Sequence, residues 1–556
     1  MPKMTGKKAL MEALIAEGTE YIFGNPGTSE TAIMDEMESY PQIKYKLVMQ
    51  EGVAMGMADA YARATLKPSF VNLHIETGLA NGLSLLHNAK EGGTPMVLTA
   101  GNLDIRESAR GRTKLTDMTD PFTKFSEEAT HPEQIPSLIR RAFMEAKTPP
   151  TGPTFVAFSA NSLDHTGEMD IYPSPQNSSL NMPDPESIEK MVDLITKAKK
   201  PIIIVGDRVS QSRATSELTE FAEMIGARVY SSIYSEMNFP STHPQYLGGI
   251  RLGFPETNQL FTNSDVIIAF GKLNSGYYMF SKPDLRFFPE QTKLVHIDVD
   301  ISGVGTYLPT DIGITSDPKS TLIKLIPAIE NTISGTYREE VRGRNTEIAV
   351  TKKSLTNSWK QLVKNRWGSS PISAERLMTD IAASVPTETI IVNDAVTSGT
   401  ALLNAFNFEN PDSVYGGRGG ALGWGIGGAL GIKLANPNKP VVAIIGDGSA
   451  MMTIQGLWTA ANENLPIVYV ICNNSTYRIL KLNMNLYKNH VMNEEKPESQ
   501  FIGMDFPIRP NFVDLAEGMG VHGQKISDPS KIKPAIKDAI NYGGPVLIDA
   551  IIDGTV

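Results

Sequence analysis

Short apolar runs alternate with helix-like segments along almost the whole chain, and this alternation restricts the possible folds more than any other feature. Near the N-terminus, helix-like segments cover residues 7–18 and 52–65, and strand-like runs cover residues 21–24, 70–74 and 96–101. A chain that alternates in this way builds a parallel sheet covered by helices. This stretch therefore predicts an α/β domain, with Thr5 as a candidate cap of its first helix.

The alternation continues in two further stretches. Strand-like runs cover residues 201–207, 265–271 and 293–300, and then 389–394, 441–446, 467–472 and 545–552. Residues 171–185 are rich in proline, serine and asparagine and predict a linker, while the polar residues 333–355 predict a connector. We therefore predict three doubly wound parallel-sheet domains, at residues 1–180, 186–332 and 360–556. The pattern leaves open that the two outer domains share one shape.

Composition and charge exclude several classes of function. The chain has 556 residues, enough for several domains, and its net charge of −10 with no basic block argues against a nucleic-acid partner. No apolar run approaches a membrane span, and the N-terminus lacks the apolar core of a signal peptide. The single cysteine, Cys472, excludes internal disulfides and lies in an apolar run, as a buried structural residue does. These features predict a cytoplasmic protein without a membrane partner.

The most informative motif joins two buried strands to two polar clusters. The apolar run 441–445 leads into Gly446-Asp447-Gly448, and the next apolar run leads into Asn473-Asn474. Twenty-four residues separate the two clusters. Either cluster alone is a common turn or loop. Together, each at the end of a buried strand, they predict a ligand site, because ligands of open α/β sheets lie at the carboxyl ends of the strands.

This arrangement resembles the cofactor-binding motif of thiamine-diphosphate enzymes, which hold the diphosphate with Mg²⁺. Mg²⁺ prefers hard oxygen ligands, and Asp447 and Asn474 offer a carboxylate and an amide oxygen. The family pattern adds the main-chain carbonyl of Thr476. Glycine lets the backbone approach the phosphates, and the amides of Gly448 and Ser449 are available to donate to them at a helix start.

A second cluster supplies what the cofactor's other ring requires. Thiamine diphosphate is activated by a carboxyl group that hydrogen-bonds its pyrimidine, so a glutamate in a dry pocket is expected. Glu51 lies between an apolar run and a helix rich in small residues. An acid at this position is also favoured by the helix dipole alone. The segments around Glu51 in the sequence favour the role in cofactor binding.

Three N-terminal segments resemble, in order and spacing, the thiamine-diphosphate decarboxylase and acetolactate synthase superfamily. They are FGNPGTSE, LVMQEG and NLHIETGLANG, at residues 23–30, 47–52 and 72–82. The resemblance covers essentially the whole chain and is closest to benzoylformate decarboxylase. It implies that Asn25 and Thr28 line the substrate side of the cofactor, that Glu51 binds the pyrimidine, and that His74 transfers protons.

The same resemblance extends to the C-terminal third. In the run GGRGGALGWG, it implies that the Gly420 carbonyl accepts from the 4′-amino group and that Leu422 holds the cofactor bent. Thr397 and Tyr477 are implied as contacts of the diphosphate. In this family the pyrimidine and diphosphate halves of a site come from different subunits, so a homodimer or homotetramer is expected.

The sequence departs from benzoylformate decarboxylase at two positions. Thr28 replaces a serine, which keeps the hydroxyl group. The enzyme's second catalytic histidine aligns with Tyr278, and a phenol is a much poorer acid–base group at neutral pH than imidazole. Tyr278 is therefore the candidate replacement at that position. His490 and His87 are the alternative sources of a proton.

These residues predict non-oxidative decarboxylation of a 2-oxo acid by thiamine diphosphate and Mg²⁺. Carboligation of the acetolactate synthase type and C–C cleavage use the same cofactor half, so the motifs leave both open. A cofactor-binding scaffold without turnover is a further hypothesis, but binding alone does not require Glu51. The middle domain lacks GxGxxG and any flavin signature, which predicts a structural role for it.

Overall fold

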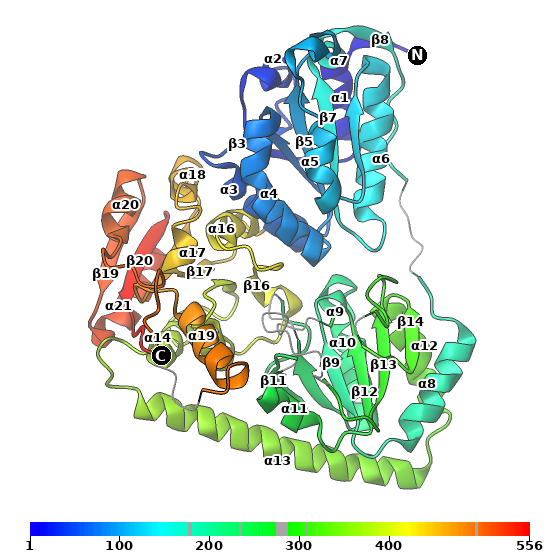
Figure 1. Cartoon of the computed structure of the whole chain (residues 1–556), viewed down its shortest axis with the longest axis vertical. Coiled ribbons are helices and arrows are strands. Elements are labelled where there is room, and N and C mark those ends of the chain that lie inside the picture. Colours follow the sequence, from blue (N-terminus) through cyan, green and yellow to red (C-terminus); the bar gives the residue numbers. More distant parts are fainter. Residues whose placement is uncertain (176–180, 233–235, 253, 274–286, 307, 495–498) are drawn as a thin grey trace.

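The computed structural model describes residues 1–556 except 176–180, 233–235, 253, 274–286, 307 and 495–498. Three domains meet at a common junction, and each is built on a six-stranded sheet (Figure 1). The strands within these sheets pair in parallel and are flanked by helices. The predicted α/β class with three parallel sheets is therefore confirmed.

The N-terminal sheet has the order β3 (Lys44–Leu47), β2 (Tyr21–Asn25), β4 (Ser69–Leu73), β5 (Met96–Asn102), β7 (Pro153–Ser159) and β6 (Ser126–Ala129). Its principal helices are α1 (Gly6–Ala16), α2 (Thr31–Met37), α3 (Glu51–Thr65), α4 (Ile75–Gly92) and α6 (Ile135–Lys147). The Thr5 hydroxyl accepts from the Lys8 amide, as expected of the cap of α1. A short antiparallel pair, β1 (Lys3–Thr5) and β8 (Thr166–Glu168), was not predicted from the sequence.

The C-terminal sheet has the order β16 (Val414–Gly416), β15 (Ile390–Asp394), β17 (Val441–Gly446), β18 (Ile467–Asn473), β20 (Val546–Ile551) and β19 (His522–Ile526). Its helices are α14 (Ala374–Ala382), α15 (Gly399–Ala405), α16 (Trp424–Ala435), α17 (Asp447–Ala450), α18 (Gly456–Asn462), α19 (Arg478–His490), α20 (Phe512–Gly518) and α21 (Ile532–Asn541). Counted within each domain, both outer sheets have the strand order 2-1-3-4-6-5. The two outer domains thus share one topology.

The middle sheet has the order β11 (Tyr246–Gly249), β10 (Arg228–Ser231), β9 (Ile202–Val205), β12 (Val266–Phe270), β13 (Lys293–Asp298) and β14 (Ile312–Thr315). Helices α8 (Pro185–Lys197), α9 (Arg208–Gln211), α10 (Thr215–Ile225) and α12 (Pro318–Glu330) flank it. Its order, 3-2-1-4-5-6, is that of dinucleotide-binding domains and differs from the order of the outer sheets.

The connector predicted at residues 333–355 is a helix rather than an irregular segment. Helix α13 (Gly335–Asn365) has 31 residues and runs along one side of the molecule, from the middle domain to the C-terminal domain (Figure 1). The Ser334 hydroxyl caps it by accepting from the Tyr337 amide. Only Tyr337, Val341 and Ile348 of this helix are buried. Without a continuous apolar stripe, its sequence lacks the periodic signal by which surface helices are recognised.

The N-terminal and C-terminal domains dock through α3 and α16. Glycines at the crossing bring the two backbones close together: a Cβ atom on Gly431 would lie 2.1 Å from the Met57 carbonyl oxygen, and one on Gly427 would lie 2.7 Å from the Val53 carbonyl oxygen. The Trp424 indole, fully buried at the start of α16, donates to Asp59 of α3 at 2.7 Å. The two outer domains therefore share one apolar core.

We predict that Gly431→Ala destabilises the protein, because the added methyl group meets the backbone of α3 and neither helix has room to move. The expected loss is about 1–3 kcal/mol of unfolding free energy. Gly343→Ala in α13 is the matched control, since its Cβ would meet nothing within 4 Å. There the free energy should stay constant or rise by up to about 1 kcal/mol. Urea-unfolding midpoints measure both, and equal midpoints for Gly431→Ala and wild type would contradict this packing.

Candidate active site

The N-terminal candidates lie where the strand order of their sheet reverses. Asn25 ends β2, His74 follows β4, and these two strands are neighbours with Asn25 in register with Leu73. Glu51 is the first residue of α3, which follows β3 on the other side of β2. The carboxyl ends of these strands therefore bring Asn25, Glu51 and His74 to one edge of the sheet, the usual position of a ligand site.

The Glu51 carboxylate is held by two amide side chains. Its Oε1 accepts from Asn25 Nδ2 at 3.1 Å, and its Oε2 accepts from Asn81 Nδ2 at 3.0 Å. Glu51 is 7% exposed. The carboxylate is thus oriented and largely dry, as a group that hydrogen-bonds a cofactor ring must be. Asn81 was missed by the sequence analysis, although it stands in the quoted segment NLHIETGLANG.

His74 is oriented by a buried acid that the sequence analysis also missed. Its Nδ1 atom lies 2.8 Å from Glu30 Oε2 and 2.9 Å from Ser29 Oγ. Glu30 is fully buried and accepts from the amides of Gly27 and Gly101, each at 2.9 Å. Because a carboxylate only accepts, Nδ1 carries the proton and Nε2 is left with its lone pair.

Gly27 is required by the packing of His74. A Cβ atom at Gly27 would lie 2.2 Å from the Nδ1 atom of His74. Thr28, the candidate hydroxyl group, is exposed beside this site, whereas the hydroxyl that contacts His74 belongs to Ser29. Both hydroxyls lie in the segment GNPGTSE.

The C-terminal candidates occupy the equivalent edge of the third sheet. Asp447 follows β17 and is 3% exposed; its Oδ1 accepts from the Gly448 amide at 2.8 Å and its Oδ2 from the Ser475 amide at 2.6 Å. Asn474 follows the neighbouring strand β18, and its Oδ1 accepts from the Thr476 amide at 3.0 Å. Burial raises the pKa of Asp447 to about 6.

A buried acid, Asp394, lies behind this edge at the end of β15. Its Oδ2 accepts from Ser449 Oγ at 2.5 Å and from the Gly425 amide at 2.8 Å, and burial raises its pKa to about 6. Ser449 Oγ in turn accepts from the Gly423 amide at 2.8 Å. The side chain of Ser449 is therefore engaged inside the protein, which leaves its backbone amide, in α17, as the candidate donor to a ligand. In the sequence, Asp394 is the last residue of the strand-like run TIIVND, and this position was the signal by which it could have been found.

The loop 417–423 carries two more candidates beside the Asp447 edge. Gly420 is exposed, with φ at +88°, and Leu422 is half-buried. Asn88 of α4 donates to the Ala421 carbonyl at 2.9 Å and accepts from the Ala421 amide at 3.0 Å. These two bonds attach the loop to the N-terminal domain.

The remaining candidates lie at the margins of the site. Thr397 is half-buried after β15, and Tyr477 precedes α19 with its ring edge-on to Phe506 at 4.7 Å. His87 packs edge-on against Phe122, and His490 is the last residue of α19. Cys472 is buried, which raises its pKa to about 12 and makes it a poor nucleophile. Tyr278 lies outside the described residues.

Three family models match consecutive parts of the chain. The N-terminal thiamine pyrophosphate binding domain matches residues 4–121, the central domain matches 188–325, and the C-terminal thiamine pyrophosphate binding domain matches 394–550. The chain belongs to the thiamine pyrophosphate enzyme family. Its cofactor is thiamine diphosphate, which is another name for thiamine pyrophosphate. Its relatives catalyse decarboxylation or C–C bond formation.

Two kinds of enzyme are found among the relatives of this thiamine pyrophosphate enzyme. The chain is 28% identical to a probable acetolactate synthase large subunit of Methanococcus aeolicus, over 99% of this chain and 92% of the relative. It is 26% identical to benzoylformate decarboxylase of Pseudomonas aeruginosa, over 98% of both chains. Benzoylformate decarboxylase of Polynucleobacter necessarius shares the fold, with a TM-score of 0.85 and 24% identity over 99% of both chains. Within the described ranges, no helix is both long and apolar enough to cross a bilayer.

The donor set around Asp447 fits a magnesium diphosphate. It offers one carboxylate, the amide oxygen of Asn474 and the main-chain carbonyl of Thr476, all hard oxygens. The described part of the chain contains no group of three or more His, Cys, Asp or Glu placed to hold a metal ion. A cation at Asp447 therefore needs further oxygen ligands, and the diphosphate and water are suited to provide them.

We predict that binding of Mg²⁺ with thiamine diphosphate weakens as the pH falls below about 6. The raised pKa means that metal-free Asp447 is protonated there, and Mg²⁺ must displace that proton. Affinity should fall by about tenfold per pH unit below pH 6 and level off above it. Isothermal titration calorimetry in buffers of different ionisation enthalpy measures the released proton. Asp447→Asn is the control, since it should release none from this position; equal proton release in both proteins would contradict the assignment.

Proposed function

We propose that this enzyme catalyses the non-oxidative decarboxylation of a 2-oxo acid, in the manner of benzoylformate decarboxylase. The observation that carries the proposal is the pairing of His74 with buried Glu30 at the same sheet edge as Glu51. Releasing an aldehyde requires that a proton be delivered to the bound substrate fragment. An imidazole is able both to accept and to donate a proton and suits this step. The 26% identity to benzoylformate decarboxylase over nearly the full length of both chains supports it.

Each candidate residue receives a role in this proposal. When bound, thiamine diphosphate supplies the nucleophilic carbon and the electron sink of the reaction. Asp447, Asn474 and the Thr476 carbonyl hold Mg²⁺, and the Gly448 and Ser449 amides hold the diphosphate together with Thr397 and Tyr477. Glu51 hydrogen-bonds the pyrimidine, and the Gly420 carbonyl and Leu422 support the same ring. Asn25 and Thr28 contact the substrate, His74 transfers protons through Nε2, and Tyr278 takes the second acid–base position.

Carboligation is the second candidate function. The probable acetolactate synthase of Methanococcus aeolicus is as similar in sequence as the decarboxylase. Tyr278 favours a contribution from carboligation. A phenol is a poor proton donor at neutral pH, so it protonates the bound substrate fragment slowly and leaves time for a second carbonyl compound to react.

We predict that the wild-type enzyme, with Mg²⁺ and thiamine diphosphate, converts one member of a panel of 2-oxo acids to CO₂ and an aldehyde. The panel includes benzoylformate and pyruvate, and NMR analysis of products with and without an acceptor aldehyde separates decarboxylation from carboligation. Glu51→Gln should still gain thermal stability from the cofactor, because the Asp447 edge is intact. Its turnover should fall by about 10²–10⁴-fold. A panel that yields only carboligation products would reject the decarboxylase assignment.

We also propose that each complete site lies between two subunits, with Glu51 from one and Asp447 from the other, in a homodimer or homotetramer. Among the residues that the structure describes, no hydrogen bond or ion pair joins the Glu51 cluster to the Asp447 cluster within one chain. Large apolar side chains beside both clusters are exposed: Met49, Val396, Met451 and Met452 are 50%, 48%, 42% and 47% exposed. A second copy that covers them explains their exposure.

A complementation experiment tests this arrangement. Glu51→Gln and Asp447→Ala subunits, co-expressed with different tags, should form a heterodimer that contains one intact site of two. We predict about half of the wild-type activity for the doubly purified heterodimer, and almost none for either parent. Co-expression of two differently tagged Asp447→Ala subunits is the matched control. A stable but inactive heterodimer would show that both halves of the site come from one chain.

A further inference from the structure

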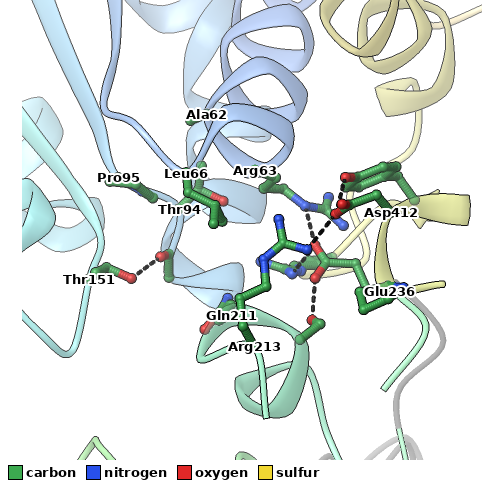
Figure 2. Close-up of a pocket in the computed structure, with 15 residues that line it drawn as sticks. Ala62, Arg63, Leu66, Thr94, Pro95, Thr151, Gln211, Arg213, Glu236 and Asp412 are labelled. Atoms are coloured by element: carbon green, nitrogen blue, oxygen red, sulfur yellow. Dashed lines mark hydrogen bonds and ion pairs between the residues drawn. The ribbon is translucent and has the colours of Figure 1, made fainter. Parts of the chain in front are cut away.

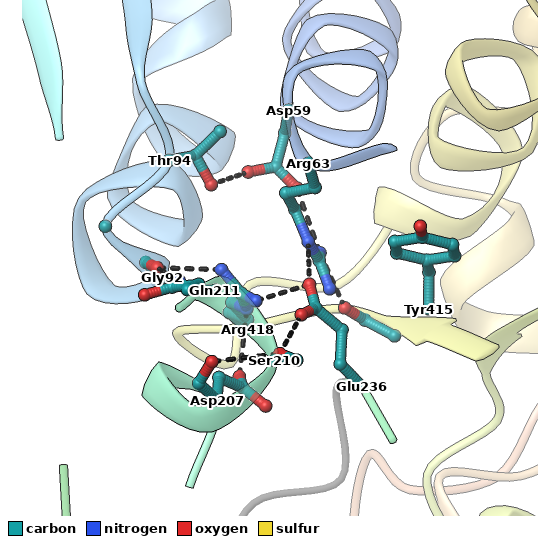
Figure 3. Close-up of polar contacts among 12 residues, drawn as sticks. Asp59, Arg63, Gly92, Thr94, Asp207, Ser210, Gln211, Glu236, Tyr415 and Arg418 are labelled. Atoms are coloured by element: carbon teal, nitrogen blue, oxygen red, sulfur yellow. Dashed lines mark hydrogen bonds and ion pairs between the residues drawn. The ribbon is translucent and has the colours of Figure 1, made fainter. Parts of the chain in front are cut away.

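One carboxylate of the middle domain connects all three domains. Glu236 Oε1 accepts from Arg63 Nε of α3 at 2.8 Å and from Nη2 of Arg418, which lies in the C-terminal domain (Figure 3). Its Oε2 accepts from the Ser210 hydroxyl of α9. The side chain of Glu236 is 8% exposed, and those of Arg63 and Arg418 are 3% and 4% exposed. These are ion pairs removed from water, so losing one partner leaves a buried charge uncompensated.

The two arginines have further partners that determine their positions. Arg63 Nη1 donates to Asp59 at 3.2 Å and to the Gly416 carbonyl at 2.9 Å. Arg418 pairs with Asp207 at 2.9 Å and donates to the Gly92 carbonyl at 2.7 Å. Each arginine therefore contacts at least two domains. Glu236 is the group that both of them share.

The elements held by these arginines are the ones that carry the cofactor candidates. Arg63 belongs to the helix that begins at Glu51. Arg418 precedes Gly420 by two residues and Leu422 by four, so it is the first anchor of the loop 417–423. The loop's other end is held by Trp424, which donates to the same Asp59 that binds Arg63. A shift of Glu236 would therefore act on both elements at once.

Packing is incomplete beside Glu236. A cavity of about 160 Å³ opens beside Glu236 and Arg63, and Leu66, Arg213 and Asp412 line other parts of it (Figure 2). Where side chains leave such space, neighbouring groups are free to move unless polar contacts hold them. The ion pairs of Glu236 therefore help to locate Arg418 relative to α3, together with the Arg63–Gly416 and Asn88–Ala421 hydrogen bonds.

The crevice that binds nucleotides in related topologies is occupied by the protein itself. It lies between the ends of β9 and β12, where the middle sheet reverses its order. Arg208, just after β9, pairs with Asp298 of β13 at 3.3 Å. A Cβ atom on Gly271, just after β12, would lie 2.9 Å from the Cβ atom of Arg208. Arg208 thus lies between the ends of β9 and β12, and Glu236 of the same domain contacts both outer domains.

We propose that Glu236 is a positioning residue through which the middle domain holds the loop 417–423 against α3, and so sets how Gly420 and Leu422 face the cofactor. The proposal rests on the proposed function for the roles of Gly420, Leu422 and Glu51. Among the described residues, Glu236 bonds to Arg63, Arg418 and Ser210 rather than to a cofactor candidate. Its effect passes through Arg418 and Arg63.

Hydrogen–deuterium exchange on the cofactor-free protein tests directly whether Glu236 holds the loop 417–423. Glu236→Gln keeps the shape of the side chain but removes its charge and replaces one acceptor oxygen by a donor. We predict that backbone amides in residues 416–423 exchange at least about tenfold faster in this variant, because a charge-assisted bond to Arg418 is lost. Amides of the three sheets should exchange as in wild type. Glu236→Asp, which keeps the charge on a shorter side chain, should show a smaller increase.

Glu463→Gln is the matched control. The Glu463 carboxylate also pairs across a domain boundary, with Lys46 of β3, but it has no contact with the loop. Exchange at residues 416–423 should stay at the wild-type rate in this variant. With cofactor, Glu236→Gln should lower kcat at least about tenfold and change the affinity for Mg²⁺ and thiamine diphosphate less than about threefold, because the Asp447 edge is intact.

Two results would overturn the proposal. If residues 416–423 of Glu236→Gln exchange at the wild-type rate, Glu236 does not hold the loop. If exchange increases uniformly over all three domains, Glu236 is only a general stabilising residue. If Glu236→Gln does not fold, Glu236→Asp is judged by the same two criteria. If wild type gains no thermal stability from Mg²⁺ and thiamine diphosphate, the proposed function fails. The exchange comparison still tests whether Glu236 holds the loop, because it uses no cofactor.

Discussion

The glycine-lined crossing of α3 and α16 is the contact on which the rest of the molecule depends. It brings the backbones so close that a methyl group on Gly431 would overlap the Met57 carbonyl. Helix α3 begins at Glu51, and α16 follows directly after the loop that carries Gly420 and Leu422. Because both helices are rigid, their crossing fixes the separation of the pyrimidine candidates from the diphosphate candidates within one chain. The hydrogen bond from Trp424 to Asp59 locks the rotation of one helix on the other.

The two outer domains solve the same problem with different chemistry. Both have the strand order 2-1-3-4-6-5, and in both the candidate residues follow strands beside the reversal of that order or one strand away from it. The N-terminal edge holds Glu51 and Glu30 with amide and imidazole donors, which keeps two acids oriented in a nearly dry site. Within the described ranges, the C-terminal edge holds Asp447 through backbone donors, and burial raises its pKa to about 6. A bound metal ion would stabilise the charged form of such an acid.

The middle domain has a different topology and a different use. Its strand order is that of dinucleotide-binding domains, yet the Arg208–Asp298 pair occupies the crevice where a nucleotide would bind. Its contribution to the site passes instead through Glu236, which reaches both outer domains. That the domain is structural, as the missing GxGxxG suggests, stays a prediction.

The sequence alone determined the fold class, the shared alternation of the outer domains and the strand ends that bear Asp447, Asn474 and Glu51. These are local properties, because apolar runs, glycines and capping residues act over a few neighbouring positions. It did not reveal α13 as a helix, because that helix lacks an apolar stripe. Only the tertiary structure identified Glu30, Asn81, Asp394 and Glu236. Their partners lie 44, 30, 55 and 173 residues away in sequence, and only the folded chain brings such donors and acceptors within hydrogen-bonding distance.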